Sequence, residues 1–130
     1  MSDKRLEQGI KNLKKIDGEA GERVIENLET IAPDVGRYIL EFAFGDIYNN
    51  DRLSFREREI ITITSLLTQG DTKQQLMVHI HGSLNVGITE EEIIEIFTHC
   101  IPYVGFPRVL NAITSAKEVF DARNKDSILF

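Results

Sequence analysis

The sequence has little of what several protein classes require. It contains one cysteine, three prolines and no tryptophan in 130 residues. Cys100 therefore has no partner for an internal disulfide or a Cys-x-x-Cys redox pair, which agrees with a reducing compartment. No apolar run approaches the roughly 20 residues of a membrane span, and the N-terminal segment is charged throughout, unlike a secretory signal. We therefore expect a cytoplasmic protein.

Basic residues are also few. The chain has 15 lysines and arginines against 21 aspartates and glutamates, and its formal net charge is -6. Binding to nucleic acid or to an anionic membrane depends on clustered basic residues, which this sequence lacks. Both partners are excluded on this ground. The apolar fraction of 42% suits a single compact domain over residues 1–130.

Alternating strand patterns are scarce, and apolar residues fall at helical spacing along most of the chain. The pattern predicts an all-α protein of about six or seven helices. The first three apolar stripes consist of Leu6, Ile10 and Leu13, then Val24, Leu28 and Ile31, then Val35, Tyr38, Ile39 and Phe42.

Two capping boxes mark helix starts. Ser54 precedes Glu57, and Thr89 precedes Glu92, at the spacing that lets each hydroxyl and carboxylate bond the first turn of a helix. The helix from Ser54 is apolar around so much of its circumference that we expect it to be the central, most buried one. A following helix over 72–86 should stop at Gly87.

Prolines shape the C-terminal part of the prediction. We expect Pro102 and Pro107 to interrupt the helical pattern, with Pro107 in the first turn of the last helix. Residues 124–130 are expected to form a frayed tail.

Two of the three histidines, His79 and His81, stand one residue apart. On a helix they point about 200° apart and cannot chelate one metal ion. The positions four residues away hold Gln75 and Ser83, which are not usual transition-metal ligands, so no metal site is expected. His79 flanks the apolar stripe and should be half-buried. It is either a structural histidine bonded to a carbonyl or carboxylate, or a functional one, while His81 is expected to be solvated.

Several stretches resemble the carboxymuconolactone decarboxylase family. The resemblance implies an all-α subunit of the alkylhydroperoxidase D-like type, strongest over 44–117, that assembles into rings, commonly homohexamers or homotrimers. The stretches are FGDIY (44–48), LSFREREIITITSLL (53–67), QLMVHIHGSLNVG (75–87), TEEEIIEI (89–96) and HCIPYVGFP (99–107), followed by LNAITSA.

One branch of the family resembles the alkylhydroperoxidases, which use a Cys-x-x-Cys pair just before a histidine. In this chain that histidine is His79, and the matching cysteine positions hold Thr72 and Gln75. Without a dithiol the redox mechanism has no thiolates to cycle. An antioxidant protein of this type is therefore the disfavoured alternative, and we expect Cys100 to be a small buried hydrophobe.

The namesake branch decarboxylates an unsaturated carboxylated lactone without a cofactor. The resemblance implies His79 as acid/base, Glu59 as its orienting partner or proton relay, and Arg58 or Arg56 as the group that holds the carboxylate. We expect the helix that carries His79 to be antiparallel to the helix that carries Glu59, so that the two residues could meet at one end of the pair. The structural alternative for both arginines is a surface ion pair with a neighbouring glutamate.

Tyr103 and His81 complete the expected substrate-binding residues. Other members often have another residue at position 81, and Trp-Gly where this chain has Phe44-Gly45. These departures put the namesake substrate in doubt. A small carboxylated molecule remains the expected ligand, no cofactor is expected, and a non-enzymatic oligomeric binding protein is the third alternative.

Overall fold

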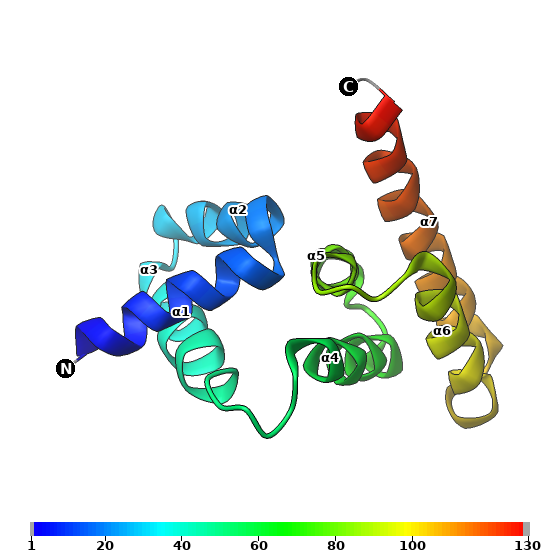
Figure 1. Ribbon diagram of the computed structural model, residues 1–130. Coiled ribbons are helices and arrows are strands. Elements are labelled where there is room, and N and C mark those ends of the chain that lie inside the picture. Colours follow the sequence, from blue (N-terminus) through cyan, green and yellow to red (C-terminus); the bar gives the residue numbers. More distant parts are fainter. Residues whose placement is uncertain (1, 129–130) are drawn as a thin grey trace. The chain divides into compact units, whose positions relative to one another are not determined.

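The computed structural model describes residues 2–128, which contain helices and no strands (Figure 1). The predicted all-α class is confirmed. None of the described helices is both long enough and apolar enough to cross a membrane. The chain forms two compact units, one that ends at Arg58 and one that begins at Glu59.

Close backbone contact between a helix and a π-helix holds the first unit together. A side chain on Gly9 would overlap the carbonyl oxygen of Leu40, and a Cβ on Gly45 would lie 2.6 Å from the carbonyl oxygen of Arg5. Only glycine permits this approach. The helices of this unit are α1 (Ser2–Ile16), α2 (Gly18–Glu29), α3 (Pro33–Tyr38) and the π-helix η1 (Ile39–Ile47).

The apolar side chains of α3 and η1 are not buried as the sequence pattern predicts. Leu40 and Phe44 are buried, whereas Val35, Tyr38 and Phe42 are about half exposed, at 47%, 56% and 59%. The helical prediction for this segment is correct, but its apolar stripe is not the buried face. A π-helix bonds residue i to i+5, so within η1 side chains depart from the positions that a 3.6-residue repeat predicts; Val35 and Tyr38 belong to α3, and this bonding does not explain their exposure.

The second unit has one apolar core. Most of α4 (Phe55–Gln69) belongs to it, with α5 (Lys73–Asn85), α6 (Glu90–Val104) and α7 (Phe106–Ile128). The fully buried side chains of this core include Ile63, Ile80, Ile93, Phe97, Ala116 and Val119.

Helix α4 begins as its capping box predicts. The Ser54 amide donates to Glu57 Oε1 at 2.8 Å, and the Glu57 amide donates to Ser54 Oγ at 3.0 Å. Its buried face is narrower than predicted, because Ile61 is 52% exposed. The expectation of antiparallel central helices is wrong, since Figure 1 shows α5 nearly end-on where α4 lies side-on.

Helix α6 combines a confirmed start with an unexpected interior. The Glu92 amide donates to Thr89 Oγ1, and the Thr89 amide donates to Glu92 Oε1, both at 3.0 Å. Pro102 lies inside the helix and does not interrupt it. The proline removes one backbone donor near the C-terminal end, and the helix ends two residues later at Val104.

The last helix is longer than predicted. Pro107 is its second residue, as its fixed φ favours. The helix continues to Ile128, and the expectation that the chain is frayed from residue 124 onward stays a prediction. Residues 129 and 130 lie outside the described range.

Candidate functional site

A buried carboxylate and an imidazole meet inside the second unit. Glu59 Oε1 lies 2.8 Å from His79 Nδ1. The side chain of Glu59 is fully buried, and that of His79 is 18% exposed. A buried carboxylate requires a hydrogen-bond donor, and the ring supplies one when Nδ1 carries the proton. His79 is therefore half-buried, as predicted, and its ring orientation is fixed by Glu59.

The local sequence explains how each partner reaches this position. Glu59, Ile63 and Leu67 recur every four residues and form the buried face of α4, so the carboxylate replaces an apolar side chain at one end of that face. On α5, His79 precedes the fully buried Ile80, and Ser83 Oγ donates to the His79 carbonyl oxygen at 2.7 Å.

This pair has the arrangement of a histidine prepared for proton transfer. A carboxylate that accepts from Nδ1–H selects the tautomer whose Nε2 is the basic nitrogen. It also stabilises the imidazolium that forms when Nε2 takes a proton. The pair could therefore deliver a proton to a substrate or remove one.

His81 makes different contacts, as its spacing from His79 predicts. Its Nδ1 lies 3.2 Å from Arg123 Nη1, and Arg123 Nη2 donates to Asn85 Oδ1 at 3.2 Å. Because a guanidinium only donates, His81 Nδ1 is the acceptor in this contact. The prediction of a solvated His81 is wrong: the residue is half-buried and helps to hold α5 against α7. Nothing in the sequence indicates this partner, which lies 42 residues away.

The two arginines lie in the first two turns of α4. Arg58 Nη2 donates to Asn50 Oδ1 at 2.9 Å, and its guanidinium stands 5.8 Å from the centre of the Tyr48 ring. Arg56 is half-buried. The sequence did not indicate that the 48–50 segment holds Arg58, and the role of either arginine at a carboxylate stays a prediction.

Tyr103 and Cys100 both lie near the end of α6. Tyr103 is 77% exposed, and its ring centre lies 5.7 Å from that of His99. Its role in substrate binding stays a prediction. Cys100 is buried, and burial raises the pKa of its thiol. A thiol with a raised pKa forms little thiolate near neutral pH, which agrees with the predicted apolar role.

The fold and the Glu59–His79 pair define an all-helical protein with a carboxylate-oriented histidine. Residues 33–118 match the model of the carboxymuconolactone decarboxylase family. The chain belongs to this family, as its sequence motifs indicated.

Two of the similar proteins are named as decarboxylases, and a third is named as a peroxisomal protein. The chain is 32% identical to a 4-carboxymuconolactone decarboxylase of Acinetobacter baylyi over 91% of its own length and 88% of the relative. It is 29% identical to the nitrosuccinic acid decarboxylase npaB of Metarhizium robertsii over 92% of its length and 85% of that protein. It is also 32% identical to Peroxisomal protein 2 of Saccharomyces cerevisiae, over 70% of this chain but 32% of that protein.

Proposed function

We propose that this protein is a decarboxylase that acts without a cofactor on a small carboxylated lactone or a related acid. The observation that carries the proposal is the 2.8 Å contact between buried Glu59 and His79. The names of two relatives support it, because both are decarboxylases and both are named for carboxylated substrates.

The chemistry requires one proton and no external oxidant. The bond between the substrate carbon and its carboxylate breaks, carbon dioxide leaves, and the electron pair stays on the carbon, delocalised onto an adjacent carbonyl or nitro group. His79 then gives a proton to that carbon, and Glu59 stabilises the imidazolium before transfer and orients the ring. The products are carbon dioxide and the protonated acid remnant.

The remaining binding roles are assigned by chemistry. Arg58 or Arg56 would bind a carboxylate of the substrate, because a guanidinium binds carboxylates through two parallel hydrogen bonds. This could be the carboxylate that leaves as carbon dioxide or one that the product keeps. Tyr103 would contact another part of the substrate, whereas His81 points away from His79 on α5 and bonds Arg123, so it would not share that substrate.

The test is carbon dioxide release from 4-carboxymuconolactone, from nitrosuccinate and from a panel of related carboxylated lactones. Wild type should release carbon dioxide from at least one compound, and His79→Gln should lower kcat about a hundredfold or more. An unchanged elution volume in size-exclusion chromatography would show that the variant keeps its assembly. Equal turnover by His79→Gln would reject the proposed role of the histidine, and no turnover of any compound would reject the substrate class.

We further propose that the subunit self-associates as a homotrimer or homohexamer. Several large apolar side chains are exposed in the described part of the chain, and an isolated soluble subunit rarely leaves so many in water. Sedimentation equilibrium should give three or six times the subunit mass, whereas a monomer would contradict the proposal. The most exposed of these apolar side chains include Ile31, Tyr38 and Phe42 in the first unit and Ile61, Tyr103, Phe106 and Leu110 in the second.

A further inference from the structure

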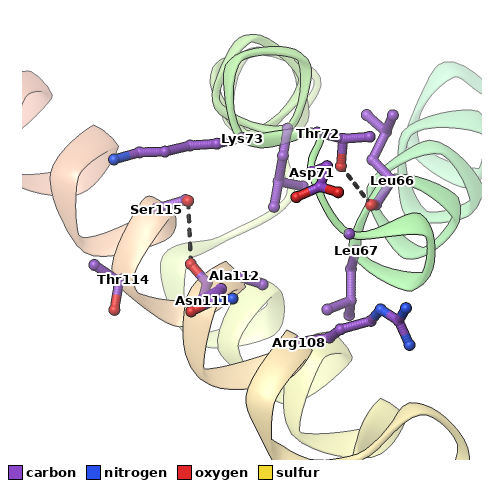
Figure 2. Close-up of a pocket in the computed structure, with 12 residues that line it drawn as sticks. Leu66, Leu67, Asp71, Thr72, Lys73, Arg108, Asn111, Ala112, Thr114 and Ser115 are labelled. Atoms are coloured by element: carbon purple, nitrogen blue, oxygen red, sulfur yellow. Dashed lines mark hydrogen bonds between the residues drawn. The ribbon is translucent and has the colours of Figure 1, made fainter.

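A cavity lies in the second unit, and its lining includes neither Glu59 nor His79. Its volume is about 270 Å³, and it lies between the turn that joins α4 to α5 and one side of α7 (Figure 2). Its apolar lining comes from three helices and consists of Leu66, Leu67, Leu76 and Ala112. From this cavity we propose a binding site for a small zwitterion of the α-amino-acid type, separate from the decarboxylase site.

The two charges that define the site are Arg108 and Asp71. Both line the cavity, yet among residues 4–125, whose side chains the structure describes, neither makes an ion pair or a side-chain hydrogen bond. Opposite charges that line one cavity without pairing leave space for a ligand that carries both charges. An α-amino acid has a carboxylate for the guanidinium and an ammonium for the aspartate.

The turn itself positions both groups. Asp71 has a positive φ of 49°, a backbone conformation that aspartate tolerates better than most residues. Gly70 precedes it, and a Cβ there would lie 3.1 Å from Arg108 Nε. Glycine at this position therefore lets the arginine lie against the turn that carries the aspartate.

The second cation of the lining does not change the charge balance. Lys73 Nζ pairs with Glu118 Oε1 at 3.1 Å, outside the lining. The cavity therefore offers one positive and one negative group, which favours a zwitterion over a simple anion or amine. Figure 2 shows the Lys73 side chain extending away from both Asp71 and Arg108.

Polar and apolar groups complete the fit to a small amino acid. The side-chain amide of Asn111 lines the cavity, and Thr114 and Ser115 present hydroxyl oxygens whose protons are donated to backbone carbonyls. The leucine and alanine side chains suit a short aliphatic group. The volume is below the roughly 300 Å³ at which pockets for drug-sized ligands begin, which restricts the ligand to a few heavy atoms beyond the two charged groups.

The experiment is an NMR titration of the full chain with L-valine, followed through the backbone amide signals of Gly70 and Asn111. We expect saturable shifts with a dissociation constant on the order of 1 mM. Isovalerate lacks the ammonium, and isobutylamine lacks the carboxylate, so each should bind at least about tenfold more weakly.

Two variants and one control locate the ligand. Asp71→Asn keeps a residue that tolerates positive φ, and Arg108→Gln changes an exposed side chain, so both should fold. Each should weaken L-valine binding about tenfold or more. Arg23→Gln, an exposed arginine of α2, should leave the binding unchanged.

Three results would overturn the proposal. One is the absence of chemical-shift changes with L-valine, L-alanine and glycine at ligand concentrations ten times the expected dissociation constant. Another is isovalerate binding as tight as that of L-valine, which would indicate a plain anion site. The third is binding that neither variant weakens, which would place the ligand elsewhere.

Discussion

Glu59 Oε1 lies 2.8 Å from His79 Nδ1, although the two residues are 20 positions apart and come from helices that cross steeply. The carboxylate is fully buried, while part of the imidazole is exposed. This difference in exposure agrees with separate roles, in which Glu59 orients the imidazole ring and His79 exchanges a proton with the substrate. A purely structural ring would not require a charged partner, because a backbone carbonyl would satisfy the same donor.

Glu59→Gln tests this division. The amide has almost the same shape, and its oxygen can still accept from Nδ1–H, but it carries no charge to stabilise an imidazolium. We expect kcat for decarboxylation to fall about a hundredfold, with a smaller change in KM. Steady-state kinetics on the substrate found for wild type would measure both.

Glu95→Gln is the matched control, since Glu95 is exposed on α6. It should keep wild-type kinetics. If Glu59→Gln were as active as this control, the carboxylate would serve the fold and not the reaction.

Features set by adjacent residues could be predicted from the sequence. Both capping boxes form as their spacing indicates, because the hydroxyl and the carboxylate act within one helical turn. The opposite directions of His79 and His81 follow from helix geometry alone. The half-buried state of His79 follows from its place beside an apolar stripe.

Features that depend on residues far apart in the chain could not be predicted from the sequence. No local pattern indicates that Arg123 bonds His81, or that Asn50 bonds Arg58. The side-chain types of Ile39–Ile47 also did not indicate that this segment forms a π-helix and not an α-helix. The exposed Ile61 shows that apolar composition alone overestimates how much of a helix is buried.

Thr89→Ala should destabilise the second unit by about 1 kcal/mol, because it removes the acceptor for the Glu92 amide at the start of α6. Thr89→Ser keeps the hydroxyl and should recover most of the loss. Urea unfolding of the three proteins would measure the free energies of unfolding. Equal stability of the alanine and serine variants would contradict a contribution from the cap.

Asp46→Asn tests a pH-dependent link between α1 and η1. Arg5 donates to both carboxylate oxygens of Asp46, at 2.9 and 2.8 Å, and these bonds hold the pKa of that carboxyl below its ordinary value. A lowered folded-state pKa means that the stabilisation is present above the unfolded-state pKa and is lost as the pH falls through the folded one.

The free energy of unfolding of wild type should therefore exceed that of Asp46→Asn near neutral pH, and the difference should disappear between about pH 5 and about pH 2. Both residues are partly exposed, so about 1 M salt should also reduce the difference. A difference that grew on acidification would have the wrong sign and would exclude this ion pair as its source.

Gly9→Ala tests the backbone contact on which the first unit depends. The added methyl group would overlap the carbonyl oxygen of Leu40, which belongs to the backbone and cannot rotate away as a side chain can. We expect a loss of about 3 kcal/mol or more in the free energy of unfolding.

Gly36→Ala is the matched control, because its methyl group would lie 3.8 Å from the nearest atoms of Ile25 and Leu28. Alanine should keep or raise stability there, by up to about 1 kcal/mol, since it favours helices more than glycine does. If urea unfolding gave the two variants the same stability, α1 and η1 would not be in contact at Gly9, and the burial of Leu40 and Phe44 would need another explanation.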